Sequence, residues 1–586
     1  MAADIILRRK AIGLEVAVTQ RAALLSGRYP HLEPQIREWT TWRTQLATKT
    51  LSGPAENESP EDHKQALNEW STRLDRLERE LASQIPELGM DDRLRNVDRH
   101  VVASALPERA VLVEFLRFNT LSFPVAGGET WKPAQYVAFV LEAGRGDEVR
   151  MVDLGDAEPI ETMVRTFRLA VQQEGATRKL ESMPQQPREA LWEIAERLRV
   201  AVFDKLFEPE WNEPPANGSG RYRRLFLATD GELNLLPFEA LRTPDGRYLT
   251  DEYEISYLGT GRDLLRSEAS VVVEAEEPVV AADPAFALAR TANSSAGNGS
   301  EFRGEMEREG IRFSPLPGTR LEGERVSWRL RVVPWVAEQV LKRKVKQLRC
   351  PWVLHTATHG YFLSDGDHLR AEFRQLRGTN RKSFERLSGE GLQNPMLRSG
   401  LALAGSQNWL ERQPVPEEAG DGLLTAEDVA TMDLRGTALA VLSACNTGMG
   451  QTRHGEGVFG LRRGFLLAGV KTLVMSLWKV DDLAAVLLMD RFYENLLDRK
   501  MGRCEALREA QRFLRRDVTV GGIRQEWLNE EMIAKLAVGN AEARERLKKW
   551  RDSPDDARPF REVFYWAPFI LHGETGPLDS SRGRER

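Results

Sequence analysis

From about residue 100 onwards, short runs rich in β-branched and aromatic residues alternate with stretches that carry apolar side chains at helical spacing. Strands are predicted at 110–116, 136–141 and 224–229, and an amphipathic helix is predicted at 191–206. Strands that alternate with helices are joined by crossover connections, so they form a parallel sheet with helices on both faces. This alternation therefore predicts an α/β fold.

A second α/β block begins near residue 277. Its predicted strands are 278–282, 352–358, 399–404, 438–444, 471–478 and 563–571. Two polar stretches interrupt the pattern. Residues 287–305 are rich in Gly and Ser, which is typical of a mobile loop, and residues 365–392 are too polar for a core, which indicates a surface insertion.

Residues 1–97 are predicted to form a helical region ahead of the first block. Large apolar side chains in this region recur at spacings of three and four, which lines one face of a helix. This apolar stripe consists of Leu67, Trp70, Leu74, Leu77 and Leu81. It must pack on something, and three surfaces are open to it: the rest of a helical bundle, the first α/β block, or a partner protein.

The composition of the 586-residue chain excludes several classes of protein. The 82 basic and 88 acidic residues give a net charge of −6, which indicates neither nucleic acid nor an anionic membrane as a direct partner. No apolar run reaches the roughly 18 residues of a membrane span, and no signal peptide is evident, so we expect a cytoplasmic protein. The cysteines, Cys350, Cys445 and Cys504, are too few for a disulfide framework and suit a reducing compartment.

Two predicted strands end in residues that carry chemistry. The segment PWVLHTATHG ends at His359 and Gly360, and the segment ALAVLSACNTG reaches Cys445. Ligands bind beyond the carboxyl ends of parallel strands, and neighbouring strands lie about 4.8 Å apart, so side chains at two such ends can meet. An imidazole beside a thiol favours the reactive thiolate. The pair predicts His359 as general base and Cys445 as nucleophile.

The backbone N–H groups of Gly360 and Cys445 are candidates for an oxyanion hole. The alternative is structural, because a cysteine that ends a buried strand often serves as a small apolar residue and a lone histidine on a strand is often part of the core. A metal bound by His355 and His359 is rejected, because residues four apart on a strand lie about 13 Å from each other. Cys350 and Cys504 lack a comparable setting and are predicted to be inert.

Several ordered segments resemble the CHAT family of caspase-like peptidases, which are related to separases. The segments are LATDGELNLLPFEAL, DEYEISYLGTGRDLL, ADPAF, LPGTRLEGE, HTATHGYF, NPMLRSGLALAG, DGLLTAEDVATMDLRGTALAVLSACNTGMG, GEGVFGLRRGFLLAGVKTLVMSLWKVDD and FYWAPFILHG. The resemblance extends over roughly 100–575 and implies a Cys–His dyad at His359 and Cys445 that needs no cofactor or metal. It also implies a caspase-like three-layer sandwich. In that sandwich 98–270 form a degenerate half and 271–578 the active half, with the helical region 1–97 before them and a disordered tail, 579–586, after them.

The resemblance further implies cleavage of protein substrates after a basic residue, because related separases prefer one. Asp481 and Asp482 follow a predicted strand and are the tentative substrate-binding residues, with Asp482 preferred. The alternative is that Asp482 caps a helix beginning at Leu483. The helical N-terminal region is expected to bind a regulatory protein. Two other functions remain open, a non-catalytic signalling scaffold that retains the fold and a different thiol enzyme such as an acyltransferase.

Overall fold

A computed structural model describes most of the chain. The described residues are 2–11, 14, 18, 30–52, 59–84, 97–119, 121–122, 130–177, 186–207, 222–266, 273–289, 295–296, 306, 311–363, 395–444, 447–448, 451–453, 457–526 and 549–578. The insertion predicted at 365–392, most of the loop predicted at 287–305 and the tail predicted at 579–586 lie outside them.

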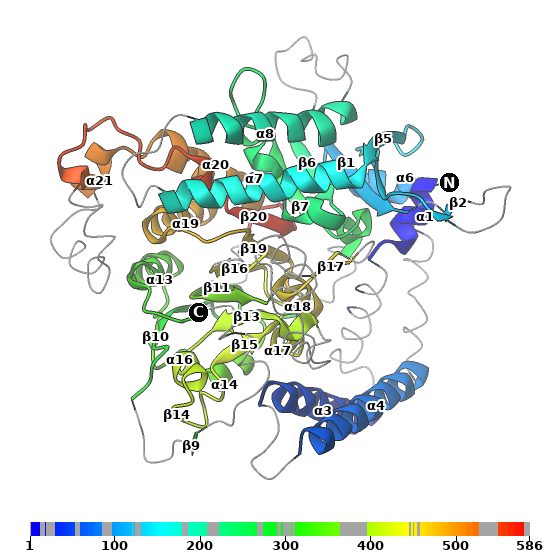
Figure 1. Cartoon of the computed structure of the whole chain (residues 1–586), viewed down its shortest axis with the longest axis vertical. Helices are drawn as coiled ribbons and strands as arrows, with labels where there is room; N and C mark the ends of the chain where they lie inside the picture. Colours follow the sequence, from blue (N-terminus) through cyan, green and yellow to red (C-terminus); the bar gives the residue numbers. More distant parts are fainter. Residues whose placement is uncertain are drawn as a thin grey trace, which may run out of the picture.

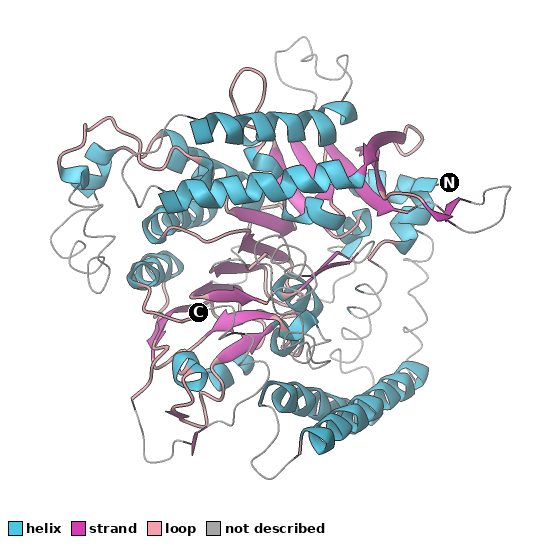
Figure 2. Cartoon of the chain, in the orientation of Figure 1, coloured by secondary structure: helices cyan, strands magenta, loops and turns pink. Residues whose placement is uncertain are grey.

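Within this part of the chain, one continuous sheet of 11 strands runs through both predicted α/β blocks (Figures 1 and 2). From edge to edge the strands are β10 (Trp335–Ala337), β8 (Val279–Pro284), β11 (Val353–Ala357), β16 (Leu439–Ser443), β19 (Thr472–Ser476), β20 (Phe569–Gly573), β7 (Glu254–Leu258), β6 (Arg224–Ala228), β1 (Ala110–Phe118), β4 (Gln135–Glu142) and β5 (Arg150–Asp156). Neighbours pair in parallel except at β19–β20, β1–β4 and β4–β5. The predicted α/β class with a mostly parallel sheet is confirmed.

The first block has helices on both faces of its strands, and the alternation of side chains along β1 shows why. Val111 and Val113 point into a core that they share with two long helices, α7 and α8. Leu112, between them, points into a second core with Leu7 and Val102 of the helices α1 and α6. The bounds of these helices are α1 (Ala2–Arg9), α6 (Arg99–Ala105), α7 (Ala157–Thr177) and α8 (Gln186–Val202).

The second block is layered in the same way. Helices α13 and α19 lie on one side of its strands and α18 lies on the other (Figure 1). The longer helices of this block and of the segment that follows are α13 (Pro317–Leu330), α18 (Leu461–Ala468), α19 (Asp482–Leu497), α20 (Arg503–Arg516) and α21 (Val520–Glu526). Shorter helices are α14 (Lys342–Lys346), α16 (Ser406–Leu410), α17 (Ala426–Ala430) and α24 (Val563–Trp566).

Two predicted strands differ from the structure. The strand predicted at 399–404 is β13 (Ser399–Ala402), but it lies in a separate three-stranded sheet with β12 (Gly360–Phe362) and β15 (Leu423–Thr425). The strand predicted at 563–571 begins as the helical turn α24 and becomes β20 only at Phe569. Pro568 separates the two, because a proline disfavours the helical conformation in the residue before it.

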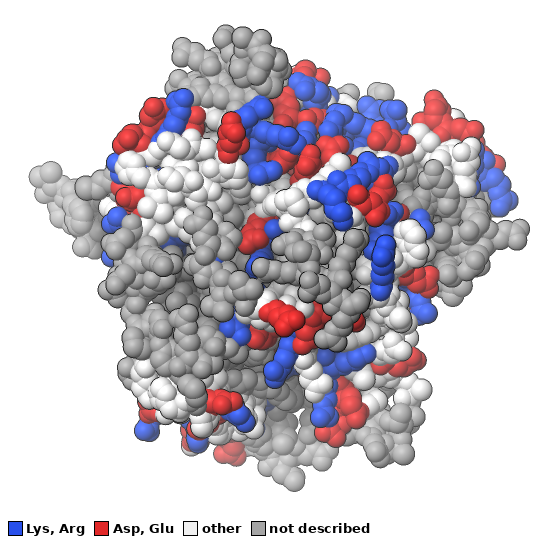
Figure 3. Space-filling model, turned by 180° about the vertical axis from the view of Figure 1, so that it is seen from behind, with Lys and Arg blue, Asp and Glu red and all other residues white. Residues whose placement is uncertain are grey.

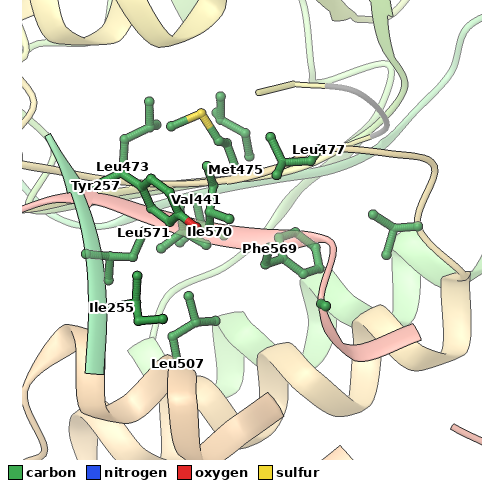
Figure 4. Packing of buried hydrophobic residues seen from close by; sticks show 14 of the residues in the cluster. Ile255, Tyr257, Val441, Leu473, Met475, Leu477, Leu507, Phe569, Ile570 and Leu571 are labelled. Atoms are coloured by element: carbon green, nitrogen blue, oxygen red, sulfur yellow. The ribbon is translucent and has the colours of Figure 1, made fainter. Parts of the chain in front are cut away.

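The strand β20 joins the two blocks. It pairs with β19 along its whole length and with β7 through the single pair His572 and Tyr257. Ser256 adds a side-chain hydrogen bond of 2.9 Å to the carbonyl of Gly573. Figure 4 shows the apolar side chains of β7, β20 and β19 packed together around this junction. The domain boundary predicted at residue 270 stays a prediction, and the sheet is continuous across it.

The apolar stripe is buried within the helical region itself. It lies on α4 (Pro60–Gln84), which pairs with α3 (Glu33–Ser52). Leu77 and Leu81 are buried in a small core with Leu32 and Trp39. Of the three surfaces open to the stripe, a neighbouring helix of its own region is therefore the one that covers this part of it.

The first helix, α1, packs into the α/β body instead. Lys10, which follows it, is 4% exposed, and its Nζ lies 2.9 Å from Oε1 of Glu114 in β1. The same Nζ donates hydrogen bonds to the carbonyls of Phe115 (2.8 Å) and Ala228 (2.6 Å). Arg262 in turn donates to the carbonyls of Leu7 and Lys10. The start of the chain is thus built into the first block.

Among the described residues on the face shown in Figure 3, acidic and basic side chains are interspersed. None of the helices in the described part of the chain is long and apolar enough to cross a bilayer.

Candidate active site

The carboxyl ends of β11 and β16 form the candidate site. These strands pair in parallel from Val353 with Leu439 to Ala357 with Ser443, and the N–H of Thr358 continues the ladder to the carbonyl of Ser443 at 3.2 Å. His359 follows Ala357 by two residues, and Cys445 follows Ser443 by two. Cys445 lies outside the described residues, whereas Ala444 before it and Thr447 after it lie inside them.

A backbone carbonyl and two aromatic rings hold the imidazole of His359. Its Nε2 lies 2.7 Å from the carbonyl oxygen of Ser314, which can only accept a hydrogen bond. The proton of the neutral ring is therefore on Nε2, and Nδ1 is left as the proton acceptor. The rings of Phe286 and Phe313 lie with their centroids 5.0 and 5.8 Å from that of His359.

This environment keeps His359 neutral. Burial lowers its pKa below the ordinary value of 6.5, the hydrogen bond to Ser314 acts in the opposite direction, and the positive charge of Lys479 lowers the pKa further. At neutral pH the ring is therefore unprotonated, which is the state that a general base requires.

Among the described strands, β12 is at the edge of the small sheet, and the N–H of Gly360 lies on the outer side of that edge. The N–H of Ala402 donates to the carbonyl of His359 (2.9 Å) and the N–H of Leu363 donates to the carbonyl of Arg398 (2.8 Å). In an antiparallel pair the bonded positions alternate, so the N–H of Gly360, between these positions, points away from β13. Because β12 is an edge strand, this N–H faces outward from the small sheet, as an oxyanion donor would have to. The oxyanion role of Gly360 and Cys445 stays a prediction.

Asp481 and Asp482 begin α19. The side chain of Asp481 accepts a hydrogen bond of 3.0 Å from the N–H of Ala484, so Asp481 is the N-cap residue and the helix begins at Asp482. The capping role considered for Asp482 thus belongs to the residue before it. Asp482 is half-buried and packs on the backbone of Gly318, where an added Cβ would lie 2.4 Å from the Cβ of Asp482. The substrate-binding role of both aspartates stays a prediction.

Asp283 is a further carboxylate at this edge of the sheet, which the sequence analysis did not single out. It lies near the end of β8, the strand on the other side of β11, and its φ of 47° is in the left-handed region. Burial raises its pKa to about 6, and Arg320, at 3.9 Å, opposes this. Its position in the segment ADPAF was the signal that could have identified it.

The other two cysteines, Cys350 and Cys504, and the histidine His355 are buried. Cys350 and Cys504 are buried free thiols whose pKa values are raised by burial, which disfavours the reactive thiolate. His355 is fully buried in β11, with Nε2 3.1 Å from Glu322 and Nδ1 3.2 Å from the hydroxyl of Tyr493. No group of three or more His, Cys, Asp or Glu residues in the described ranges is arranged to hold a metal ion.

The fold and this strand-end site define an α/β protein with a histidine at the ligand-binding edge of a parallel sheet. The model of the CHAT domain matches residues 190–574, which is about two-thirds of the chain. The chain belongs to the CHAT domain family. The match begins within α8, so the first strands of the first block lie outside it.

The curated relatives are much longer proteins. Tetratricopeptide repeat protein 28 of Homo sapiens is 26% identical over 306 residues, which are 51% of this chain and 11% of that protein. The Mus musculus protein of the same name is 27% identical over 307 residues, or 51% and 12% of the two chains. This chain thus matches about a tenth of the length of each relative.

Two solved structures show a distant likeness. The Saccharomyces cerevisiae separase in a separase–securin complex matches over 83% of this chain and 31% of its own, with 9% identity and a TM-score of 0.40. The cysteine proteinase gingipain R, described as Arg specific, matches over 66% and 67%, with 7% identity and a TM-score of 0.30. These scores are too low to carry an argument about this chain.

Proposed function

We propose that the chain is a cysteine endopeptidase of the CHAT family, with Cys445 as nucleophile and His359 as general base. The observation that supports it best is the parallel register of β11 and β16, whose ladder leads to His359 on one strand and to Cys445 on the other after equal numbers of residues. Membership of the CHAT domain family supports the same proposal.

In the proposed reaction, Nδ1 of His359 takes the proton of the Cys445 thiol while the sulfur attacks the carbonyl carbon of the scissile bond. The N–H groups of Gly360 and Cys445 donate to the developing oxyanion. When the C–N bond breaks, the imidazolium returns its proton to the leaving amine. Water, with its proton taken by the same imidazole, then attacks the thioester carbonyl. The C–S bond breaks, the imidazolium returns the proton to the thiolate of Cys445, and the acid product leaves. No metal or cofactor takes part in these steps.

Two other functions compete with this proposal. A non-catalytic scaffold that retains the fold would bind proteins and cleave none, and a thiol acyltransferase would pass the acyl group to an acceptor other than water. Incubation of the chain with a peptide library, followed by mass spectrometry, distinguishes the three. New peptide termini indicate the endopeptidase, acylated acceptors indicate the transferase, and unchanged peptides with retained protein binding indicate the scaffold.

For specificity, we propose that Asp482 pairs with a basic side chain immediately before the cleaved bond. A charge-assisted hydrogen bond contributes about 1.5–3 kcal/mol, so Asp482→Asn should lower kcat/KM for peptides with Lys or Arg there by roughly 10- to 100-fold. Asp481→Asn is the matched control, because asparagine caps a helix as well as aspartate does and the same charge is removed one residue away.

A library that shows apolar residues before the cleaved bond would contradict this specificity. An equal loss of kcat/KM in Asp482→Asn and Asp481→Asn would indicate a general electrostatic effect instead of a direct contact with the substrate. Asp283→Asn is included because that carboxylate lies at the same edge of the sheet, and a selective loss in this variant alone would move the specificity role to β8.

For regulation, we propose that a protein partner binds the pair α3 and α4 and releases a latent enzyme. The repeat-containing relatives support a protein partner in general terms. A chain that lacks 30–84 but keeps α1 should then cleave a peptide mixture several-fold faster than the full chain. If the full chain alone matches the shortened chain in rate, the enzyme is not latent.

A further inference from the structure

The last residue of β19, Ser476, binds the chain on both sides of the two residues Cys445 and Asn446. Its hydroxyl donates to the carbonyl of Ala444 on the strand side. On the other side its N–H donates to Oγ1 of Thr447 at 3.0 Å, and its carbonyl accepts from the N–H of Gly448 at 2.7 Å. The two hydroxyls of Ser476 and Thr447 lie 3.4 Å apart.

This arrangement is buried and tightly packed. Ser476 is 0% exposed and Thr447 is 1% exposed, so their hydrogen bonds do not compete with water. A Cβ on Gly448 would lie 3.0 Å from the carbonyl oxygen of Ser476 and 2.9 Å from the side chain of Leu477. Only a glycine lets the chain after Thr447 approach β19 this closely.

We infer that Ser476 is a positioning residue, which holds the segment between Ala444 and Thr447 so that the thiol of Cys445 lies beside His359. The inference rests on the proposed function. β11 and β16 bring the amino side of that segment to the site, but their ladder ends at Ser443. The neighbouring strand, β19, carries Ser476, which makes hydrogen bonds to both ends of the segment.

The physical reason for such a residue is the sensitivity of the chemistry to geometry. A displacement of about 1 Å between reacting groups can lower a rate by roughly 100-fold, and two residues without fixed ends have more freedom than that. The alternative is that Ser476 only satisfies a buried carbonyl, in which case its removal would lower stability and leave the thiol where it is.

The experiment compares Ser476→Ala with the wild type in two measurements. The first is the rate of alkylation of Cys445 by iodoacetamide across pH, assigned by peptide mass mapping, since Cys350 and Cys504 are buried. The second is the separate measurement of kcat and KM on a cleaved peptide. We expect the pH midpoint of alkylation to move up towards that of an ordinary thiol, about 8.5, and kcat to fall roughly 10- to 100-fold with little change in KM.

Two further variants distinguish positioning from stability. Thr447→Ser keeps the hydroxyl and should behave as the wild type in both measurements. Thr472→Val removes a buried hydroxyl at the opposite end of β19, where it accepts from Arg503 at 2.8 Å and donates to the carbonyl of Glu574 at 2.9 Å. It should lower the unfolding midpoint and leave the alkylation profile unchanged.

The inference is wrong if Ser476→Ala keeps the wild-type alkylation profile, or if Thr472→Val shifts that profile equally. The inference is also wrong if Cys445 of the wild type shows the alkylation profile of an ordinary thiol and His359→Ala leaves that profile unchanged. A shifted profile in a protein that cleaves no peptide supports the positioning role and contradicts the proposed endopeptidase, so the two failures are distinguishable.

Discussion

Replacing Cys445 or His359 by alanine should lower peptide-bond cleavage by about three orders of magnitude or more, because a nucleophile and its base act as one unit. The fold should survive both changes. His359 lies two residues after β11 and is half-buried, and its ring donates a hydrogen bond to the carbonyl of Ser314. The measurement is the cleavage rate on a peptide library, with circular dichroism and the unfolding midpoint as checks on the fold.

The controls are the other thiols. Cys350→Ser and Cys504→Ser should keep most of the activity, because both thiols are buried away from the candidate site. The thiol of Cys504 donates to the carbonyl of Ile255 at 3.2 Å, and a serine hydroxyl can make the same hydrogen bond. Wild-type activity in a folded Cys445→Ala variant would remove the basis of the proposed mechanism.

The second large effect concerns stability. Lys10→Met should lower the free energy of unfolding of the first block by about 3–5 kcal/mol, because it leaves the carboxylate of Glu114 buried without its cation. The side chains of this ion pair are 2% and 3% exposed. The loss should shrink in the double variant Lys10→Met/Glu114→Gln, since the remaining amide is neutral. Urea unfolding followed by fluorescence measures both.

An exposed ion pair gives the comparison. Arg76 and Glu80 form an i,i+4 pair on α4 with side chains 76% and 43% exposed, and Arg76→Met should leave the midpoint unchanged. If Lys10→Met also leaves the unfolding midpoint unchanged, α1 is not part of the folded body. If it is destabilising, a truncation at residue 97 cannot test regulation, because it removes α1 together with α3 and α4.

The sequence was sufficient to predict most strands, and it places His359 and Cys445, the residues of the proposed site, just after two of them. Strands such as β1 and β16 are local runs of apolar and β-branched residues, and His359 and Cys445 each stand just after one of them. Such local patterns do not fix the sheet in which a strand lies, because pairing depends on contacts far apart in the chain. β13 was therefore predicted correctly as a strand, and only the structure placed it in the small sheet.

Several contacts, in the candidate site and elsewhere, had no sequence pattern that could have predicted them. The group that binds His359 is the carbonyl of Ser314, and every residue offers a carbonyl. Lys10 stands in a run of basic residues that indicates a solvated surface, and it is buried only because β1 supplies Glu114 to meet it. The helix α19 begins one residue earlier than predicted, so the cap passes from Asp482 to Asp481, a difference that the two adjacent aspartates do not reveal.

The place of β20 determines when the chain can finish folding during its synthesis. This strand comes after every other strand of the large sheet in the chain, yet it lies in the middle of that sheet, between β19 and β7. Until the ribosome has made it, both of those strands have an unpaired edge, which attracts wrong partners. The two blocks can therefore join only after β20 has been made. A peptidase built in this way would acquire its supporting sheet, and with it its activity, only when the segment that closes the sheet has emerged.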